Sequence, residues 1–212
     1  MKQLKIFVIV LILIISKFAN AQSVADVFNS NTLTWYGLDF SHARFIGDFG
    51  PIVGKNGNVL RDGFFSPWNS TVIKEIKKYD FAKYYDKDSF DTNLGDVETI
   101  NSKVDASNII VSTPPTPFTE SILQNEVNKY AKGKSGLGLV YIIEVFNKAA
   151  VSGIINVVFF DKSSGKILLT KRIQSKPAGF GVKNYWLKSV LETMVTSKEE
   201  WKMWKKESGV KK

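Results

Sequence analysis

The sequence contains no cysteine, and this absence excludes several kinds of site. Without a thiol there can be no disulfide framework, no thiolate nucleophile, no cysteine-ligated metal and no lipid-modified cysteine at a mature N-terminus. Histidine is nearly absent too, because His42 is the only one. A zinc site would then need several carboxylates, and the sequence has no set of them at ligand spacing. We therefore expect neither a metal nor another cofactor.

A hydrophobic run long enough to span a bilayer is also missing. The longest unbroken apolar run, residues 6–15, has ten residues, whereas a spanning helix needs about 20. It follows a basic start and precedes a small-residue site that contains Ala19 and Ala21. This pattern predicts a secretory signal peptide over residues 1–21, cut before Gln22. A retained N-terminal anchor is the alternative.

Export and the lack of cysteine together predict where the protein works. Small exported eukaryotic domains often rely on disulfides, so their absence favours the periplasm or the exterior of a Gram-negative bacterium. A mature chain without a lipid-modified cysteine is expected to be released in soluble form, and it is not a transmembrane protein once the signal peptide is removed.

The charge is positive but not extreme. The formal net charge is +9, and residues 1–21 hold three of the 29 basic residues and none of the 20 acidic ones, which leaves the mature chain at +6. Because an exported chain meets little nucleic acid, we expect no nucleic-acid partner. An envelope protein, peptidoglycan or lipid is the expected partner.

Residues 22–197 are long enough for one domain with its own core. In its first part, alternation predicts a strand over residues 33–46, and glycine-rich sequence predicts a loop up to Ser66. Ser66 and Pro67 are typical of a helix start. Further elements are expected as a strand within residues 89–99, a strand at 109–111, and a helix between Thr116 and Gly133.

The C-terminal half carries the clearest pattern. Residues 137–147, 151–160 and 166–173 are three β-rich runs joined by short connections, which predicts an antiparallel meander. Residues 184–195 then place apolar side chains on one helical stripe. The fold class we predict is α+β, a mixed α/β sandwich with a single mixed sheet, a C-terminal antiparallel three-strand meander and about three packed helices.

The run INVVFFDKSSGKILLTKRI at residues 155–173, with the helix after it, resembles the end of small α/β modules in exported envelope proteins. Such modules occur in the N-terminal domain of TolB and in curli-secretion and penicillin-binding-protein activator lipoproteins. The whole chain is also similar to secreted Gram-negative envelope proteins of unassigned function. The resemblance implies a fold and a setting but no activity, and the missing cysteine excludes the lipoproteins' anchor.

Candidate catalytic residues are few. His42 follows Ser41, but adjacent strand residues point apart, so His42 is not expected to act as the base for Ser41. Asp39 and Glu144 are a possible general acid and base, because each lies among apolar strand residues. Burial raises the pKa of a carboxyl group, as a catalytic acid requires. Structural ion pairing is the alternative for both.

Three other segments have a functional and a structural interpretation. The run GFGVKN at residues 179–184 has the glycines of a phosphate loop, but its spacing favours close helix packing. Residues 69–71 form a glycosylation sequon, which matters only in a eukaryotic secretory route. The basic tail, residues 198–212, places tryptophan and lysine together and could contact a membrane surface or a partner, or cover the core. The tail residues in question are Trp201, Lys202, Trp204 and Lys205.

The sequence thus predicts an exported, non-enzymatic binding or accessory protein of the cell envelope. Two alternatives remain open. One is a carboxylate-dependent hydrolase that uses Asp39 and Glu144. The other is a carrier of a lipid or small apolar ligand, which requires an apolar pocket of several hundred cubic ångströms, roughly the size typical of ligand sites.

Overall fold

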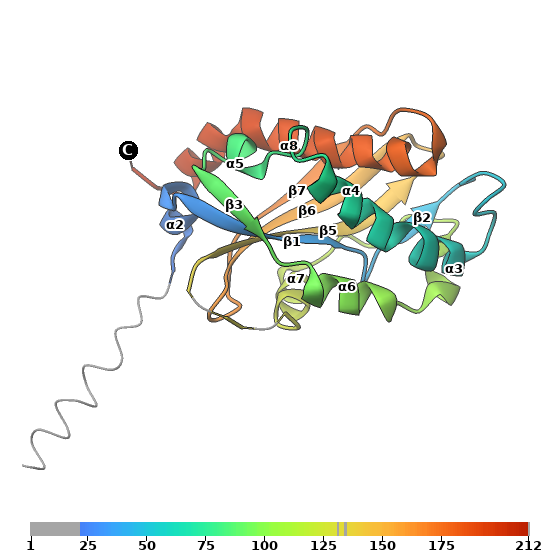
Figure 1. Ribbon diagram of the computed structural model, residues 1–212, viewed down its shortest axis with the longest axis horizontal. Helices are drawn as coiled ribbons and strands as arrows, with labels where there is room; N and C mark the ends of the chain where they lie inside the picture. Colours follow the sequence, from blue (N-terminus) through green and yellow to red (C-terminus); the bar gives the residue numbers. More distant parts are fainter. Residues whose placement is uncertain (1–21, 131, 134, 212) are drawn as a thin grey trace, which may run out of the picture.

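Strand β5 (Leu137–Asn147) is the centre of one mixed sheet (Figure 1). On one edge it pairs in parallel first with β1 (Thr32–Asp39) and then with β2 (Arg44–Ile46), which lie in series. On the other edge it pairs antiparallel with β6 (Ser152–Asp161), which in turn pairs antiparallel with β7 (Ile167–Ser175). The short strands β3 (Ser89–Thr92) and β4 (Ile110–Val111) extend the sheet in parallel beside β1 and β2.

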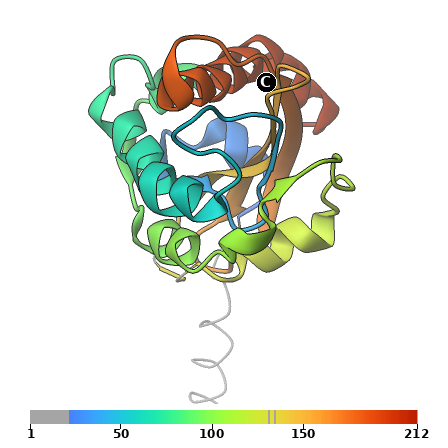
Figure 2. The same cartoon turned by 90° about the vertical axis from the view of Figure 1, so that its right-hand side faces the viewer.

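Helices cover both faces of this sheet (Figures 1 and 2). One face carries α8 (Gly181–Glu207) and α5 (Phe81–Tyr84), and the other carries α6 (Gly95–Ser102) and α7 (Glu120–Val127). The remaining helical segments are α2 (Val24–Asn29), α3 (Gly57–Leu60), the π-helical turn η1 (Arg61–Phe65), α4 (Ser66–Lys74) and the 3₁₀ turn η2 (Ala106–Asn108).

The computed structural model describes residues 22–130, 132–133 and 135–211, so the predicted signal peptide lies outside the described residues. Within them, the predicted mixed α/β class with a single sheet is confirmed, although the helices outnumber the expected three. No helix in the described part of the chain is long and apolar enough to cross a membrane.

The core has two parts, one on each side of the sheet. Beneath α8 it is largely aromatic, and Trp186 stacks on Phe146 with ring centroids 4.3 Å apart. Beneath α6 and α7 it is mostly aliphatic, built from residues such as Val140 and Val158. Helix α8 packs tightly on the sheet at Gly153, where an added Cβ would lie 2.1 Å from the Ser189 hydroxyl oxygen.

Two sequence predictions about the first part of the chain need correction. Residues 33–46 do not form one strand, because the chain turns between β1 and β2, where the Ala43 N–H donates to the Phe40 carbonyl (3.0 Å). Ser66 begins α4 but does not cap it, because the helical segment starts earlier, where Asn56 accepts a hydrogen bond from the Asn58 N–H (3.0 Å).

The helical segment then runs without interruption through α3, η1 and α4. A proline inside a helix lacks an N–H, and its ring crowds the preceding turn. The wider π-helical turn of η1 directly before Ser66 gives room for Pro67. The glycine-rich segment expected to be a loop is therefore helical from Gly57 onward.

Two helices also differ from their predicted bounds. Thr119, not Thr116, caps α7, accepting a hydrogen bond from the Ile122 N–H (3.3 Å), and α7 ends before Gly133. Helix α8 does not stop near residue 195 but continues to Glu207. Residues 198–207 are consequently the last turns of a core helix and not a separate tail.

Candidate functional site

Two buried asparagines hold the end of β1 in place. Strand β3 pairs with β1 only as far as Trp35, so the outer edge of β1 has no strand beside it further on. Asn69 of α4 takes that place, accepting from the Leu38 N–H (2.6 Å) and donating to the Leu38 carbonyl (3.1 Å). Asn101 of α6 donates to the same carbonyl (2.9 Å) and accepts from the Phe40 N–H (2.8 Å). The chain therefore leaves the sheet in a fixed direction.

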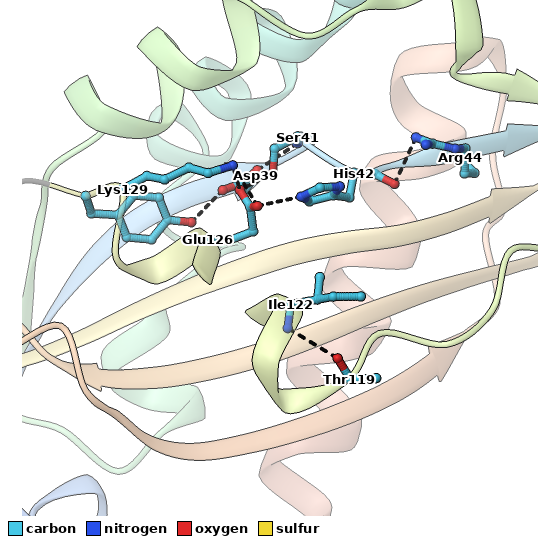
Figure 3. A network of polar contacts seen from close by, with 9 residues as sticks. Asp39, Ser41, His42, Arg44, Thr119, Ile122, Glu126 and Lys129 are labelled. Atoms are coloured by element: carbon cyan, nitrogen blue, oxygen red, sulfur yellow. Dashed lines mark hydrogen bonds and ion pairs between the residues drawn. The ribbon is translucent and has the colours of Figure 1, made fainter. Parts of the chain in front are cut away.

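The turn that follows carries a polar network centred on Glu126 of α7 (Figure 3). The Glu126 carboxylate accepts hydrogen bonds from the Ser41 hydroxyl (2.9 Å) and from the Lys129 ammonium (2.7 Å to each oxygen), and it contacts His42 Nε2 (2.5 Å). The Glu126 side chain is 2% exposed, whereas that of His42 is 40% exposed. The network thus has a buried anion beneath a half-exposed imidazole.

Glu126 is a fixed charge and not a general base. Burial opposes its ionisation, but hydrogen bonds from His42 and Lys129 outweigh that effect and lower the pKa of Glu126 to about 2. A carboxylate with so low a pKa is a poor proton acceptor near neutral pH. Glu126 therefore stabilises the turn and holds the Lys129 ammonium.

Ser41 and His42 do not form a nucleophile–base pair. The two side chains were predicted to point apart along a strand. Instead, residues 40–43 form a turn, and both side chains contact Glu126. The Ser41 hydroxyl proton goes to the carboxylate and not to the imidazole. The arrangement lacks the serine–histidine hydrogen bond that activates a serine nucleophile.

Asp39 lies below the turn and is completely buried. It accepts hydrogen bonds from the Tyr130 hydroxyl (2.5 Å) and from the Ser41 N–H (2.8 Å). Burial raises the pKa of Asp39, as expected for a carboxyl group in this position. These two hydrogen bonds use both carboxyl oxygens of Asp39 to connect the turn with Tyr130.

Glu144 is held by a different set of partners. Its carboxylate accepts hydrogen bonds from Arg172, from Nε to both oxygens (3.1 and 3.0 Å) and from an Nη (2.7 Å), and one from Asn156 (3.0 Å). Asp39 and Glu144 have no common hydrogen-bond partner among the described residues. The geometry therefore gives no support to a hydrolase that uses these two carboxylates, and Glu144 is in the structural ion pair that was the alternative.

Sequence analysis missed Glu126 and Tyr130, which complete the network. A signal for Glu126 was available, because it lies three residues after Leu123 and directly before Val127, on the buried stripe of α7. A carboxylate on such a stripe needs a buried partner. Nothing in the local sequence identifies that partner as His42, which lies 84 residues earlier.

A second site is an apolar groove of about 420 Å³ at the end of the sheet, where the N-terminus of α8 meets the chain after β2. Its floor contains Phe49 and Trp186, whose rings stack with centroids 5.7 Å apart. Tyr185 lies edge-on to Trp186 at 5.1 Å. Pro51 and Ile52 form its outer wall, and Ile52 is 74% exposed. We call this the α8 groove.

The α8 groove depends on a glycine in the left-handed region. Gly47, at φ 98°, follows β2, and an added Cβ would lie 3.0 Å from the Ala149 nitrogen and 3.2 Å from the Lys148 Cβ. The β5–β6 turn can therefore lie close beside the groove and supply Lys148. The Lys148 ammonium lies 3.4 Å from the centre of the Tyr185 ring, a cation–π contact.

The run GFGVKN forms the start of α8, but its glycines do not serve close packing against the sheet. Gly179 and Gly181 have positive φ of 108° and 74°, and no atom lies within 4 Å of an added Cβ at Gly181. They allow the turn that brings the chain into the helix. The sequon residue Asn69 is fully buried and hydrogen-bonded, so it is not accessible to glycosylation in the folded protein.

The four tail residues proposed as a contact surface separate into two groups. Trp201 and Trp204 are 4% and 1% exposed and belong to the core, which was the structural interpretation. Lys202 is exposed, and Lys205 is partly exposed. The tryptophans cannot insert into a membrane from this position.

No group of three or more histidine, aspartate or glutamate side chains in the described part of the chain could hold a metal ion. No family model matches the sequence, and comparison with curated proteins gives no significant match. The functional assignment therefore depends on the two sites and on the sequence.

Proposed function

We propose that the mature chain is an exported, non-enzymatic binding protein of the cell envelope. We further propose that its ligand is a small amphipathic molecule, an apolar body with an anionic head, held in the α8 groove. The single observation that carries this proposal is the groove itself, which is lined by aromatic and aliphatic side chains and contains a cation. It favours the carrier alternative among binding functions.

The size and lining of the α8 groove suit such a ligand. Its volume of about 420 Å³ falls within the range of sites for small molecules. Apolar side chains left in contact with water, such as Ile52, give up that contact when a ligand covers them, which favours binding. The resemblance to modules of exported envelope proteins stays a prediction, and it is consistent with a binding protein of the cell envelope.

Lys148 is the group that would select an anionic head. The charged residues that line the groove are Lys148 and Asp48. Asp48 accepts a hydrogen bond from the Gly50 N–H (2.7 Å) within its own loop. Lys148 forms no ion pair with a described residue and contacts the Tyr185 ring instead. A carboxylate would pair with this ammonium group at the edge of the apolar floor.

Calorimetric titration of the mature chain, residues 22–212, tests the proposal with three probes that share a twelve-carbon chain: dodecanoate, dodecanol and dodecyltrimethylammonium. Dodecanoate should bind most tightly and the ammonium least. Lys148→Gln should weaken dodecanoate binding about tenfold, the effect of one charge-assisted contact, and should leave dodecanol binding unchanged. Equal affinity for all three probes, or no binding of any, contradicts the proposal.

A matched pair of surface variants locates the ligand. Ile52→Ser removes an exposed apolar side chain from the wall of the groove, and Ile76→Ser removes one that is 52% exposed and does not line it. The first should weaken dodecanoate binding and the second should not. A loss of equal size in both variants would place the ligand elsewhere.

Export is tested separately. Expression of the full chain in a Gram-negative host, followed by fractionation and intact mass measurement, should give a periplasmic or secreted protein that begins at Gln22. Ala21→Arg should block that cleavage. Retention in the cytoplasm with Met1 in place would contradict the proposed location without affecting the binding test.

A further inference from the structure

The end of α8 farthest from the α8 groove is strongly basic. A depression of about 590 Å³ lies at its C-terminus, between the last turns of the helix and the chain that follows. Four of the six lining residues are lysines, and none is acidic; the lysines are Lys202, Lys205, Lys206 and Lys211. We call this surface, together with the adjoining α2, the basic pole.

The lysines are held on a rigid support. Trp201, on the buried side of the same turns, lies 4.9 Å from the Phe28 ring of α2 and 5.7 Å from the Phe159 ring of β6. The Trp204 indole N–H donates to Glu200 (3.0 Å). Since the buried face of the helix is fixed in this way, Lys202 and Lys206 stay on the solvent side.

Acidic residues, Asp26 of α2 among them, lie nearby, but none of them lines the depression. Glu200 accepts the indole hydrogen bond, and Glu207 pairs with Lys171 of β7 (2.7 Å). A further lysine adds to the positive charge. Lys87 is buried beneath the pole, where its ammonium donates to the Val27 carbonyl (2.8 Å). Burial lowers the pKa of Lys87 to about 8; the Asp86 carboxylate opposes this shift, and the charge of Lys205 adds to it.

The N-terminal end of the fold lies at the same pole. Helix α2 packs beside the C-terminal end of α8 (Figure 1), and the Lys205 ammonium lies 3.4 Å from the Asn29 side-chain oxygen.

We propose that the basic pole docks onto the surface of a bilayer that contains anionic lipids. Lysine clusters bind such surfaces because each lysine near the surface is attracted by the negative lipid headgroups. The contact is electrostatic, since both tryptophans of the region are buried in the core. It is independent of the ligand proposed for the α8 groove, because different residues form the two surfaces.

Vesicle co-sedimentation of the mature chain tests this proposal. Vesicles with 30% phosphatidylglycerol in phosphatidylcholine should bind the protein, and pure phosphatidylcholine vesicles should not. Raising the salt to 0.5 M should release it, because screening shortens the reach of surface charges. Binding that is equal on both vesicles and insensitive to salt would overturn the proposal.

Charge-reversal variants separate a defined surface from net charge alone. Lys202→Glu, Lys205→Glu and Lys206→Glu together should weaken binding at least about 100-fold, since loss of the attraction of three lysines alone gives a change of that size. The matched control reverses three exposed lysines near the end of α4, Lys74, Lys77 and Lys78, and should change binding no more than about twofold.

Two further results complete the test. Equal losses in the two triple variants would mean that the protein has no docking surface and binds through its net charge, which would overturn the proposal. Circular dichroism reports whether each variant is folded. The corresponding glutamine triple at residues 202, 205 and 206 removes the charges without reversing them, and it should also lose most of the binding.

Discussion

Asparagine side chains can replace a missing strand, and their loss is then costly. Asn101 donates to the Leu38 carbonyl and accepts from the Phe40 N–H, and all of these groups are buried. Asn101→Ala leaves the Phe40 N–H without its partner, while the Leu38 carbonyl keeps the amide of Asn69. We expect the free energy of unfolding to fall by about 2–3 kcal/mol, measured by urea denaturation.

The control for this prediction is Asn108→Ala. Asn108 is exposed in η2, and its amide donates to Asp105 at 3.3 Å. This substitution should change the free energy of unfolding by less than about 0.5 kcal/mol. Similar losses in both variants would show that Asn101 has no special part in holding the turn.

Glu126 should make stability depend on pH in the acid range. Its pKa is about 2 in the folded protein and 4.5 as the ordinary value. A depressed pKa means that the unfolded chain binds the proton first as pH falls. The stabilisation is therefore complete above about pH 4.5 and is lost as the pH falls toward 2.

The measurement compares the free energy of unfolding of the natural chain and Glu126→Gln between pH 6 and pH 2. The difference between them should shrink as pH falls, because the variant lacks the titrating group. Glu199→Gln, at an exposed position of α8, is the matched control and should follow the natural chain. A constant difference across this range would show that the carboxylate charge is not what stabilises the turn.

At the residue scale the sequence identified part of the network. His42 stood out because it is unique, and Asp39 because it lies among apolar strand residues. Their partners Glu126 and Tyr130 did not, because each contact joins positions more than 80 residues apart. Side chains that meet only after folding leave no local pattern, apart from a polar residue on a buried stripe.

Helix α8 depends on the last turns that sequence analysis assigned to a tail. Trp204 is 1% exposed and belongs to the main core cluster. Trp204→Ala should lower the free energy of unfolding by about 3–5 kcal/mol, as large-to-small substitutions in a core do. Met203→Ala, which alters a side chain that is 48% exposed on the same turn, should change it by less than about 0.5 kcal/mol. Thermal or urea denaturation of both variants gives the comparison.

Elements with a strong local pattern were predicted closely, and the others were not. The runs at residues 137–147, 151–160 and 166–173 match β5, β6 and β7 to within two residues at each end. The break between β1 and β2 could not be predicted, because it is imposed by Asn69 and Asn101 from distant helices. The continuation of α8 was hard to predict, because lysines dominate its last turns and Trp201 and Trp204 are the large apolar residues on the buried side there.

At the scale of the whole molecule, α8 connects two surfaces of opposite character. Its N-terminal turns line the apolar groove, and its C-terminal turns carry the lysines of the basic pole. The lysines of the basic pole lie within ten residues and are visible in the local sequence, whereas the groove is not. The groove combines three separate segments, near residues 48–52, 148 and 179–186, and only the fold brings them together. Docking by the basic pole would leave the groove at the far end of the helix, open to ligand.

The length of α8 predicts that the two surfaces act independently. Its 27 residues span about 40 Å at a rise of about 1.5 Å per residue, which is several times the distance of about 8 Å over which charges act at physiological salt. The Lys202, Lys205 and Lys206 reversal should therefore leave dodecanoate affinity within about twofold, and Ile52→Ser should leave vesicle binding equally unchanged. The four-residue combination should show both losses, each as large as in its parent variant. If either variant alters the other assay, the two ends are coupled through α8, and the groove and the basic pole belong to one binding event.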